Sequence, residues 1–521
     1  MTAVRDRGVD ADVVVVGYGP IGQTLALLLA GAGRRVVVLE RQRRPYPLPR
    51  ATSFDGETAR SLARAGAGEA FTRIGEAADG YDWRTADGRT LIGVDFAATG
   101  RYGWPDVTTM HQPALEAVLR ERAAALPGIE VRTGCTVTDV TEDGEVTYTA
   151  ADDDTTAGVT GSWVVGCDGA NSTVRRRTGA GVTDLGFSYD WLLCDVVLAA
   201  PRTFSPTNLQ ICDPARPTTV VASGPGRRRW EFMRLPGEDL GDLDRDETAW
   251  RLLKAFDVRP DNAALERRAV YRFRASWADR WRRGRVLLAG DAAHSMPPFT
   301  GQGMCSGIRD VVNLAWKLDL VLRGVASGTL LDTYAEERVP HVRATVETAV
   351  ALGRVVCVTG EAAAAHRDAA LVPGPRSGAP EPVPLRAGVL HRAPGGASPP
   401  PVGEPVPQGR VTAGAVTGLF DEVVGHGFVL LSTADPVPAL GDADRAFLAA
   451  IGARVVVLAP AGTSSPDPVD TDGTYYAYLR SVRARALLVR PDHIIFGAAR
   501  TVSQIPGIIG RLRDLLHLTD V

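Results

Sequence analysis

The sequence is almost free of lysine, and its few cysteines form no pattern. Lys254 and Lys317 are its only lysines, so nearly all of the 58 basic residues are arginines. We interpret this excess of arginine as a compositional bias rather than a functional feature. The net charge of −3 does not indicate a basic surface that would bind a nucleic acid. The 6 cysteines are scattered without a C-x-x-C pair, which predicts neither a metal site nor a disulfide framework.

Long apolar segments are also missing. No stretch approaches the roughly 20 apolar residues of a membrane span, and residues 1–10 are too polar for a signal peptide. Together with the unpaired cysteines, this predicts a cytoplasmic protein without a membrane span. What the chain does have is length, because 521 residues with 45% hydrophobic content suit two or three globular domains.

A dinucleotide-binding pattern begins at residue 12. A β-branched run ending at Val16 predicts a buried strand, a helix follows, and a second strand ends at Glu40. Between the first strand and the helix lies a G-x-G-x-x-G motif made of Gly17, Gly19, Pro20, Ile21 and Gly22. Its glycines allow a tight turn, a close approach to a pyrophosphate and close helix packing. Glu40 can accept both ribose hydroxyls and would repel a 2′-phosphate, so we expect FAD or NAD.

Two further strand ends carry a carboxylate. Buried strands are predicted before Asp168-Gly169 and before Gly290-Asp291. Alone, such a pair is most often a simple turn. Because both follow buried strands and accompany the glycine motif, we expect all three to converge on one edge of a parallel sheet. A helix beginning near Met304 would direct its N-terminal amides into that site.

Several polar residues are candidates for the same site. Four arginines lie between Arg41 and Arg50; such a cluster is usually a solvated surface, but one or two could pair with a pyrophosphate. Residues 52–65 predict a helix that carries Asp55. Gln112 precedes a second predicted helix and would lie beside the site.

The remaining regions predict further units. Residues 181–283 predict an antiparallel sheet that roofs the pocket, with its aromatic residues mostly in the core. Residues 373–408 are rich in Pro, Gly and Ala and predict a linker or an extended arm. Past Arg410 a small α/β unit without cysteine is expected.

These motifs together resemble the class A FAD-dependent aromatic hydroxylases, the family of para-hydroxybenzoate hydroxylase, phenol hydroxylase and 3-(3-hydroxyphenyl)propionate hydroxylase. The resemblance rests on the glycine motif, on C-D-G at 167–169, and on G-D-A-A-H at 290–294 with G-Q-G at 301–303. Similarity to the last-named hydroxylase is closest over 301–318 and 331–337. One departure is Cys305, where many relatives carry asparagine.

The resemblance implies an α/β fold with a Rossmann-type FAD-binding domain, an inserted antiparallel β-sheet substrate domain and a C-terminal thioredoxin-like α/β domain. The implied divisions are 1–72, 106–180 and 284–372 for FAD binding, 73–105 and 181–283 for substrate, 373–408 as linker, and 409–521 as the thioredoxin-like domain. The last domain lacks redox cysteines, which implies a structural or oligomerisation role and admits a homo-oligomer.

The resemblance also implies roles in holding FAD. Glu40 would bind the ribose, Arg50 and Gln112 would contact the pyrophosphate and ribityl chain, and Val137 would meet the adenine through its backbone. Asp168 would lie behind the pyrophosphate and Asp291 would bind the ribityl chain. The isoalloxazine edge would be lined by Pro298, Gly301, Gly303 and Met304, with His294 and Pro297 in the wall near the reacting carbon.

The expected function is hydroxylation of a phenolic substrate. NADPH or NADH would bind transiently, since no second glycine motif exists, and reduce FAD; O₂ would then give a flavin C4a-hydroperoxide that transfers oxygen to the ring. Asp55 is a candidate base for the phenol, with helix capping or solvent exposure as its alternatives. Two other interpretations stay open: a tailoring oxygenase (hydroxylation, epoxidation or Baeyer–Villiger insertion) of a polycyclic, polyketide-type aromatic, and a flavin-binding sensor or interaction protein.

Overall fold

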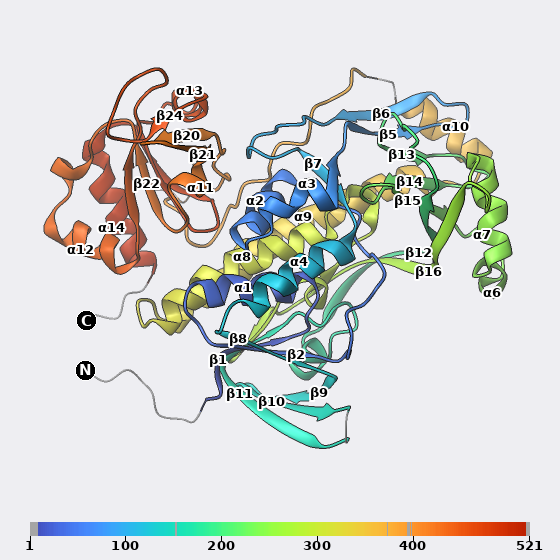
Figure 1. Cartoon of the computed structure of the whole chain (residues 1–521), viewed down its shortest axis with the longest axis horizontal. Coiled ribbons are helices and arrows are strands. Elements are labelled where there is room, and N and C mark those ends of the chain that lie inside the picture. The colour runs from blue at the N-terminus through green and yellow to red at the C-terminus, as the bar shows by residue number, and fades with distance from the viewer. Residues whose placement is uncertain (1–8, 152–153, 372–373, 393–395, 397–398, 517–521) are drawn as a thin grey trace.

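The computed structural model describes residues 9–151, 154–371, 374–392, 396 and 399–516. These residues adopt a mixed α/β fold with five β-sheets (Figure 1). Two eight-stranded sheets form the main body, and two smaller sheets form a C-terminal unit beside it. Within the described part of the chain, no helix combines the length and the apolar composition needed to cross a membrane.

The central sheet has the strand order β17-β18-β11-β1-β2-β8, with β10 and β9 continuing from β11. Its strands are β1 (Ala11–Val16), β2 (Val36–Glu40), β8 (Ile129–Thr133), β9 (Cys135–Val140), β10 (Glu145–Ala150), β11 (Thr156–Gly166), β17 (Arg282–Arg283) and β18 (Val286–Leu288). β1 pairs in parallel with both β2 and β11, so its valines are buried on both faces. This explains why the strand is a continuous apolar run rather than an alternating one.

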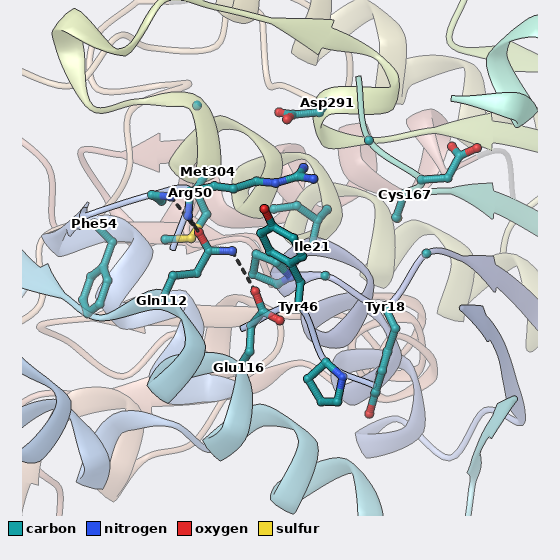
Figure 2. Close-up of a pocket in the computed structure, with 18 of the residues that line it drawn as sticks. Tyr18, Ile21, Tyr46, Arg50, Phe54, Gln112, Glu116, Cys167, Asp291 and Met304 are labelled. Atoms are coloured by element: carbon teal, nitrogen blue, oxygen red, sulfur yellow. Dashed lines mark hydrogen bonds between the residues drawn. The ribbon is translucent and has the colours of Figure 1, made fainter. Parts of the chain in front are cut away.

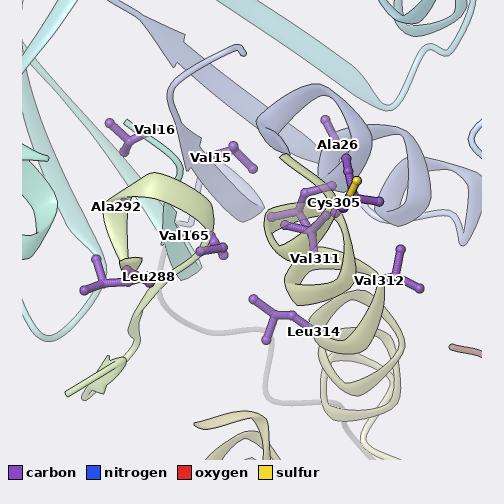
Figure 3. Packing of buried hydrophobic residues seen from close by; sticks show 14 of the residues in the cluster. Val15, Val16, Ala26, Val165, Leu288, Ala292, Cys305, Val311, Val312 and Leu314 are labelled. Carbon is purple, nitrogen blue, oxygen red and sulfur yellow. The ribbon is translucent and has the colours of Figure 1, made fainter. Parts of the chain in front are cut away.

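Further helices surround the sheets of the main body, and the last of them lies beside the second sheet, where its Arg367 donates to the carbonyl of Cys212. They are α1 (Pro20–Gly31), α2 (Gly56–Arg64), α3 (Phe71–Ile74), α4 (Gln112–Ala124), α5 (Thr173–Arg177), α8 (Gly303–Leu322), α9 (Asp332–Val356) and α10 (Glu361–Ala370). Figure 3 shows Val15 and Val165 of the sheet facing Val311 and Leu314 of α8 across the main core. Because α8 contacts α1, α2 and α9 as well, it is buried along most of its length.

The second sheet has the order β19-β16-β12-β15-β14-β13-β5-β6. Its strands are β5 (Gly80–Arg84), β6 (Thr90–Asp95), β12 (Val182–Leu198), β13 (Asn208–Ile211), β14 (Thr218–Ala222), β15 (Arg227–Met233), β16 (Ala263–Ala278) and β19 (His294–Ser295). The expected antiparallel sheet is present, with one difference: β13 pairs in parallel with β5. The short helices α6 (Leu240–Leu243) and α7 (Asp246–Leu253) follow β15, and Trp230 and Phe232 share a separate core with α7.

A three-stranded sheet corrects the predicted helix over residues 52–65. It consists of β3 (Ser53–Asp55), β4 (Gly75–Ala77) and β7 (Val107–Met110). β3 pairs antiparallel with β7, so the chain is extended through Asp55 and the helix begins only at Gly56. Propensity did not indicate this strand because its pairing partner lies more than fifty residues further along the chain.

The C-terminal unit contains a four-stranded sheet of order β23-β22-β25-β26 and a three-stranded sheet of order β21-β20-β24. The strands are β20 (Arg410–Ala413), β21 (Val416–Leu419), β22 (Val429–Ser432), β23 (Arg454–Val457), β24 (Val469–Asp470), β25 (Ala486–Val489) and β26 (Ile495–Ala499). The helices are α11 (Phe420–Val423), α12 (Asp442–Ala450), α13 (Thr474–Ser481) and α14 (Ile505–Leu515).

The unit is joined to α8 and α9 by apolar packing and by buried charges. Trp316 belongs to the same hydrophobic cluster as Phe428, the residue before β22. Lys317 and Glu337, both fully buried, form an ion pair of 2.9 Å, and Glu337 also pairs with Arg490 at 2.7 Å. A charge left alone in this place would be costly, so the three side chains fix the unit against the main body.

Candidate active site

A cavity of about 930 Å³ lies between the carboxyl edge of the central sheet and the second sheet. Figure 2 shows part of its lining, with side chains that come from segments far apart in the sequence. Most residues that the sequence analysis placed in the site line the cavity, and the exceptions are Gly22, His294 and Pro297. Those that line it are Gly17, Gly19, Pro20, Ile21, Glu40, Arg41, Arg50, Asp55, Gln112, Val137, Asp168, Asp291, Pro298, Gly301, Gly303 and Met304.

The glycine motif makes the turn from β1 into α1. Gly17 has a positive φ of 101°, and a Cβ there would lie 2.5 Å from the carbonyl oxygen of Cys167. A Cβ on Gly22 would lie 2.0 Å from the carbonyl oxygen of Gly17, whereas one on Gly19 would meet no protein atom within 4 Å. Gly22 therefore allows close packing, and Gly19 leaves room on the cavity side.

Carboxylates at the strand ends organise the backbone around the cavity. Glu40 accepts hydrogen bonds from the amides of Tyr18 and Gln42, each at 2.8 Å. Asp168 accepts from the amides of Thr173 and Val174 at 2.6 and 3.1 Å. Both carboxylates therefore lie at the cavity with their orientation fixed.

Asp310, a buried residue of α8, fixes the Gly290–Asp291 turn. Its carboxylate accepts from the amide of Gly290 at 3.0 Å and pairs with His294 at 2.7 Å and with Arg338 at 2.9 Å. Burial would raise the pKa of Asp310, but His294 and Arg338 outweigh it and lower the pKa to about 2. The sequence analysis missed this residue, although a carboxylate inside an apolar helix was a usable signal.

His294 corrects one expectation. It does not line the cavity: it is buried, stacks on Trp281 with ring centroids 5.5 Å apart, and is held by Asp310. Pro298 does line the cavity, while Pro297 does not. The physical reason is the turn at Gly290, which directs His294 into the core behind the loop rather than towards the cavity.

Gln112 is used to position a loop. Its side-chain oxygen accepts from the amides of Arg50 and Ala51 at 3.0 and 2.6 Å, and its nitrogen donates to Glu116 at 2.7 Å (Figure 2). Arg50 lines the cavity, and its guanidinium carbon lies 5.6 Å from the centroid of the Tyr46 ring (Figure 2). The predicted contact of Gln112 with a cofactor stays a prediction, and its structural contacts set the path of the Arg50 loop.

Asp55 caps α2 and forms an ion pair. One carboxylate oxygen accepts from the amide of Thr58 at 2.8 Å; the other is bonded to Arg309 and to Gln302, the latter at 3.0 Å. Burial would raise the pKa of Asp55, but Arg309 and the Thr58 amide hold it below its ordinary value. This environment suits a residue that fixes the 301–303 loop, and the predicted role as a base stays untested.

Cys305 lies beneath that loop. Its side chain is fully buried, and its sulfur donates a long hydrogen bond of 3.8 Å to the carbonyl of Gly301. Burial raises the pKa of its thiol to about 12. Cys305 does not line the cavity, and its contact with the site is the hydrogen bond to the loop at Gly301.

The second sheet closes the other side of the cavity. It contributes Tyr81, Asn208, Thr219, Val221, Arg229, Glu231 and Ser295 to the lining. The sequence analysis named only aromatic residues of this region and expected most of them in the core, where Trp230 and Phe232 do lie. The polar residues were missed because alternation along a strand does not reveal whether the polar face meets solvent or a cavity.

Arg229 ties the second sheet to the Arg50 loop. It forms a buried ion pair with Asp195 at 2.7 Å and donates to the carbonyls of Arg50 and Pro49 at 2.6 and 2.8 Å. Arg267 also donates to the carbonyl of Pro49. The loop is thus held from the sheet by two guanidinium groups and from α4 by Gln112.

The residues present suit a flavin dinucleotide. Glu40 ends β2 where a ribose would be bound, and the open side of Gly19 admits a pyrophosphate at the start of α1. At the other end, α8 begins at Gly303, so the N-terminus of the helix lies at the cavity, which Gly301, Gly303 and Met304 line. The carboxylate at the end of β2, the glycine turn and the two helix N-termini therefore indicate that the cavity is a flavin-binding site.

Comparison with known proteins agrees. A family described as "FAD binding domain" matches residues 10–349, and an "HcaD C-terminal domain" matches 403–514. The chain is 40% identical to a probable NADH-specific resorcinol 4-hydroxylase of Rhodococcus jostii, over 96% of this chain and 94% of the relative. It is 34% identical to a 3-(3-hydroxy-phenyl)propionate/3-hydroxycinnamic acid hydroxylase of Mycolicibacterium smegmatis, over 97% and 93%.

Solved structures show the same fold. The flavin-dependent monooxygenase PieE matches with a TM-score of 0.81 at 21% identity, over 98% of this chain and all of that one. Aklavinone-11 hydroxylase, solved with FAD and aklavinone, matches with a TM-score of 0.76 at 25% identity, over 98% and 100%. The chain belongs to the FAD-dependent aromatic hydroxylases. The predicted flavoprotein monooxygenase is thereby confirmed as an enzyme, in preference to a flavin-binding sensor.

Proposed function

We propose that this hydroxylase acts on a small, uncharged phenol of the resorcinol class and uses NADH. The observation that carries the proposal is the charge of the side chains with which the second sheet lines the cavity. Arg229 is the cationic side chain that the described part of the second sheet contributes to the lining, and its donors are taken by Asp195 and by two carbonyls. No guanidinium that the described part of this sheet contributes to the lining is thus left to bind a substrate carboxylate.

The relatives support the same substrate class. The resorcinol hydroxylase shares 40% identity with this chain, compared with 34% for the relatives that act on hydroxyphenylpropionate, which is a carboxylate. We propose NADH as the reductant because the relative from Rhodococcus jostii is described as a probable NADH-specific enzyme. A polycyclic substrate is the second candidate, because aklavinone-11 hydroxylase aligns with 98% of the chain.

We propose that the residues expected from the sequence hold FAD, and their place in the cavity lining supports this. Glu40 would bind the ribose, Gly19 and Arg50 the pyrophosphate, Asp291 the ribityl chain, and Gly301–Met304 the ring edge. When bound, FAD accepts a hydride from NADH and supplies one oxygen atom of O₂ to the substrate ring. The protein's part is to exclude water from the cavity and to stabilise negative charge through the N-terminal amides of α8.

We also propose the domain division inferred from the sequence. The central sheet and its helices would form the FAD-binding domain, the second sheet the substrate domain, and residues 409–521 a thioredoxin-like domain. The matched HcaD C-terminal domain and the four-stranded sheet β23-β22-β25-β26 support the last of these. Because this domain contains no cysteine that could transfer electrons, we assign it a structural role, which includes contact between protomers.

The test is a substrate panel with purified FAD-loaded protein. NADH and NADPH oxidation would be followed with resorcinol, phenol, 3-(3-hydroxyphenyl)propionate and a polycyclic phenol, and products would be identified by mass spectrometry. The proposal expects resorcinol to stimulate NADH oxidation most strongly and to yield a hydroxylated product. Stimulation by the carboxylate or the polycyclic phenol alone would contradict it.

A further inference from the structure

Glu231 is a buried carboxylate on the cavity side of the second sheet. It lies on β15 between β12 and β14, where it is opposite Leu193 and Thr219. Its neighbours Trp230 and Phe232 point to the other face and pack in a separate core. Successive side chains of a strand alternate, so Glu231 is turned towards the cavity, and it is only 3% exposed.

The carboxylate of Glu231 lacks a partner on one side. Its Oε2 atom is buried and accepts no hydrogen bond from any described residue. Its Oε1 atom lies 3.8 Å from the Nη1 of Arg229, which instead donates to the carbonyl of Arg50 at 2.6 Å. The hydroxyl of Thr219 is directed to Gln210 at 2.7 Å. An unpartnered buried carboxylate is costly, so its donor is expected to come from a molecule in the cavity.

We propose that Glu231 determines substrate specificity: it accepts a hydrogen bond from a phenolic hydroxyl of the bound substrate and excludes substrates that carry a carboxylate. The inference rests on the proposed function, because it assigns the recognition of the uncharged phenol to one side chain. A hydroxyl has the donor that Oε2 lacks, whereas an anion would add a second negative charge in a place from which water is excluded.

The charges around Glu231 support this specificity. The groups that face it are Asp195 on β12, Arg229 on its own strand, Arg267 on β16 and Tyr81 on β5. With Glu231 ionised, two carboxylates balance two guanidinium groups, and an anionic substrate would leave one negative charge in excess. With Glu231 protonated, the same set is positive by one charge and tolerates an anion.

This balance makes the discrimination depend on pH. Burial, aided by Asp195 and opposed by Arg229 and Arg267, raises the pKa of Glu231 to about 7. Above that pH the carboxylate accepts the phenolic hydroxyl and repels an anion. Below it the protonated acid no longer repels, so the preference for resorcinol over 3-(3-hydroxyphenyl)propionate is expected to shrink as pH falls from 8 to 6.

The experiment measures binding separately from turnover. FAD-loaded wild type, Glu231→Gln and Glu231→Asp would be titrated with both compounds without NADH, and dissociation constants taken from the change in flavin absorbance at pH 6, 7 and 8. Glutamine keeps an acceptor oxygen but loses the charge, and a hydrogen bond to a charged group is stronger than one to a neutral group by about tenfold in affinity. Glu231→Gln is therefore expected to weaken resorcinol binding by about tenfold, to improve binding of the carboxylate, and to abolish the pH dependence of their ratio.

Two further proteins make the result decisive. Glu231→Asp keeps the charge but withdraws it by one methylene, so it should weaken resorcinol binding and still exclude the carboxylate. Glu266→Gln removes an exposed carboxylate from β16 of the same sheet and should leave both affinities unchanged. FAD content and thermal stability would show that each variant is folded, and the pH dependence of the wild type tests the inference even if a variant does not fold.

The outcomes separate the inference from the proposed function. If wild type binds resorcinol but the ratio of the two dissociation constants is independent of pH and unchanged in Glu231→Gln, Glu231 does not determine specificity. If wild type binds neither resorcinol nor another phenol, the proposed function itself fails and the inference fails with it.

Discussion

The glycine motif allows a prediction about two substitutions. Gly19→Ala should weaken FAD binding, and Gly22→Ala should destabilise the fold. Gly19 has φ of −75°, which alanine adopts readily, and a Cβ there would meet no protein atom within 4 Å. The methyl group of Gly19→Ala would project on the cavity side, at the start of α1. We expect FAD affinity to fall by at least tenfold because the methyl occupies the approach to the pyrophosphate.

The stability of the Gly19→Ala apoprotein should barely change. Alanine is a poorer N-cap than glycine, which costs about 0.5–1 kcal/mol, but it reduces the entropy of the unfolded chain by a similar amount of about 0.4–1 kcal/mol. These effects oppose each other, so the free energy of unfolding without FAD should stay within about 1 kcal/mol of wild type.

Gly22→Ala should behave in the opposite way. Its Cβ would lie 2.0 Å from the carbonyl oxygen of Gly17, a backbone atom that cannot rotate aside. Helix α1 would have to move away from the turn, and overpacking of this kind costs about 1–3 kcal/mol or more. Unfolding of the apoprotein in urea should show this loss directly.

Gly31→Ala is the matched control on the same helix. Gly31 is exposed, and a Cβ there would meet nothing within 4 Å. FAD titration followed by flavin fluorescence, and urea unfolding of the apoproteins, would be run on all three variants. The reasoning is refuted if Gly19→Ala binds FAD as tightly as Gly31→Ala, or if Gly22→Ala is as stable as wild type.

Three further predictions follow from the buried polar groups. Asp55→Asn should lower the free energy of unfolding at pH 7 by about 1–3 kcal/mol. Because the pKa of Asp55 is lowered, this stabilisation is present above the ordinary aspartate pKa and is lost as acid protonates the carboxylate, so urea unfolding should show a smaller difference from wild type at pH 3 than at pH 7. Loss of one limb of the pH–rate profile in the variant would instead identify Asp55 as a base. Glu337→Gln should cost about 3–5 kcal/mol in urea unfolding at pH 7 by leaving Lys317 and Arg490 underpaired, and a cost below about 1 kcal/mol would contradict the assigned network. Cys305 should resist iodoacetamide at pH 8 in the native protein and react after denaturation, as read by mass spectrometry, because burial raises the pKa of its thiol to about 12.

The position of the site followed from sequence because its determinants are local. A buried strand, a glycine turn and a helix start are written in consecutive residues, and the same holds for Asp168 and Asp291 at their strand ends. The structure brings these segments to one cavity because β1, β11 and β18 are parallel neighbours in the central sheet. Parallel pairing alone places their carboxyl ends at one edge.

The partners of individual side chains did not follow, because they are distant in the chain. Asp55 was predicted inside a helix, but pairing of β3 with β7 extends the backbone and makes Asp55 the cap. The two amides that donate to the side-chain oxygen of Gln112 lie about sixty residues earlier in the chain. Glu231 alternates with Trp230 as on any half-exposed strand, and only the packing of the central sheet's domain against that face turns it into a cavity wall.

The residues that sequence analysis missed share a physical role. Asp310 and Arg229 each form a hydrogen bond with the backbone of a cavity loop, as does Gln112, which the sequence analysis did name. Such loops bear glycine and proline and have few side chains of their own to hold them, so their geometry depends on anchors from the helices and sheet behind them. α8 supplies one anchor at Asp310 and, two turns later, pairs Lys317 with Glu337 and hence with Arg490 of the C-terminal unit. A single buried helix therefore joins the loop geometry of the site to the docking of the C-terminal unit, and this connection gives a cysteine-free domain a structural reason to be part of the enzyme.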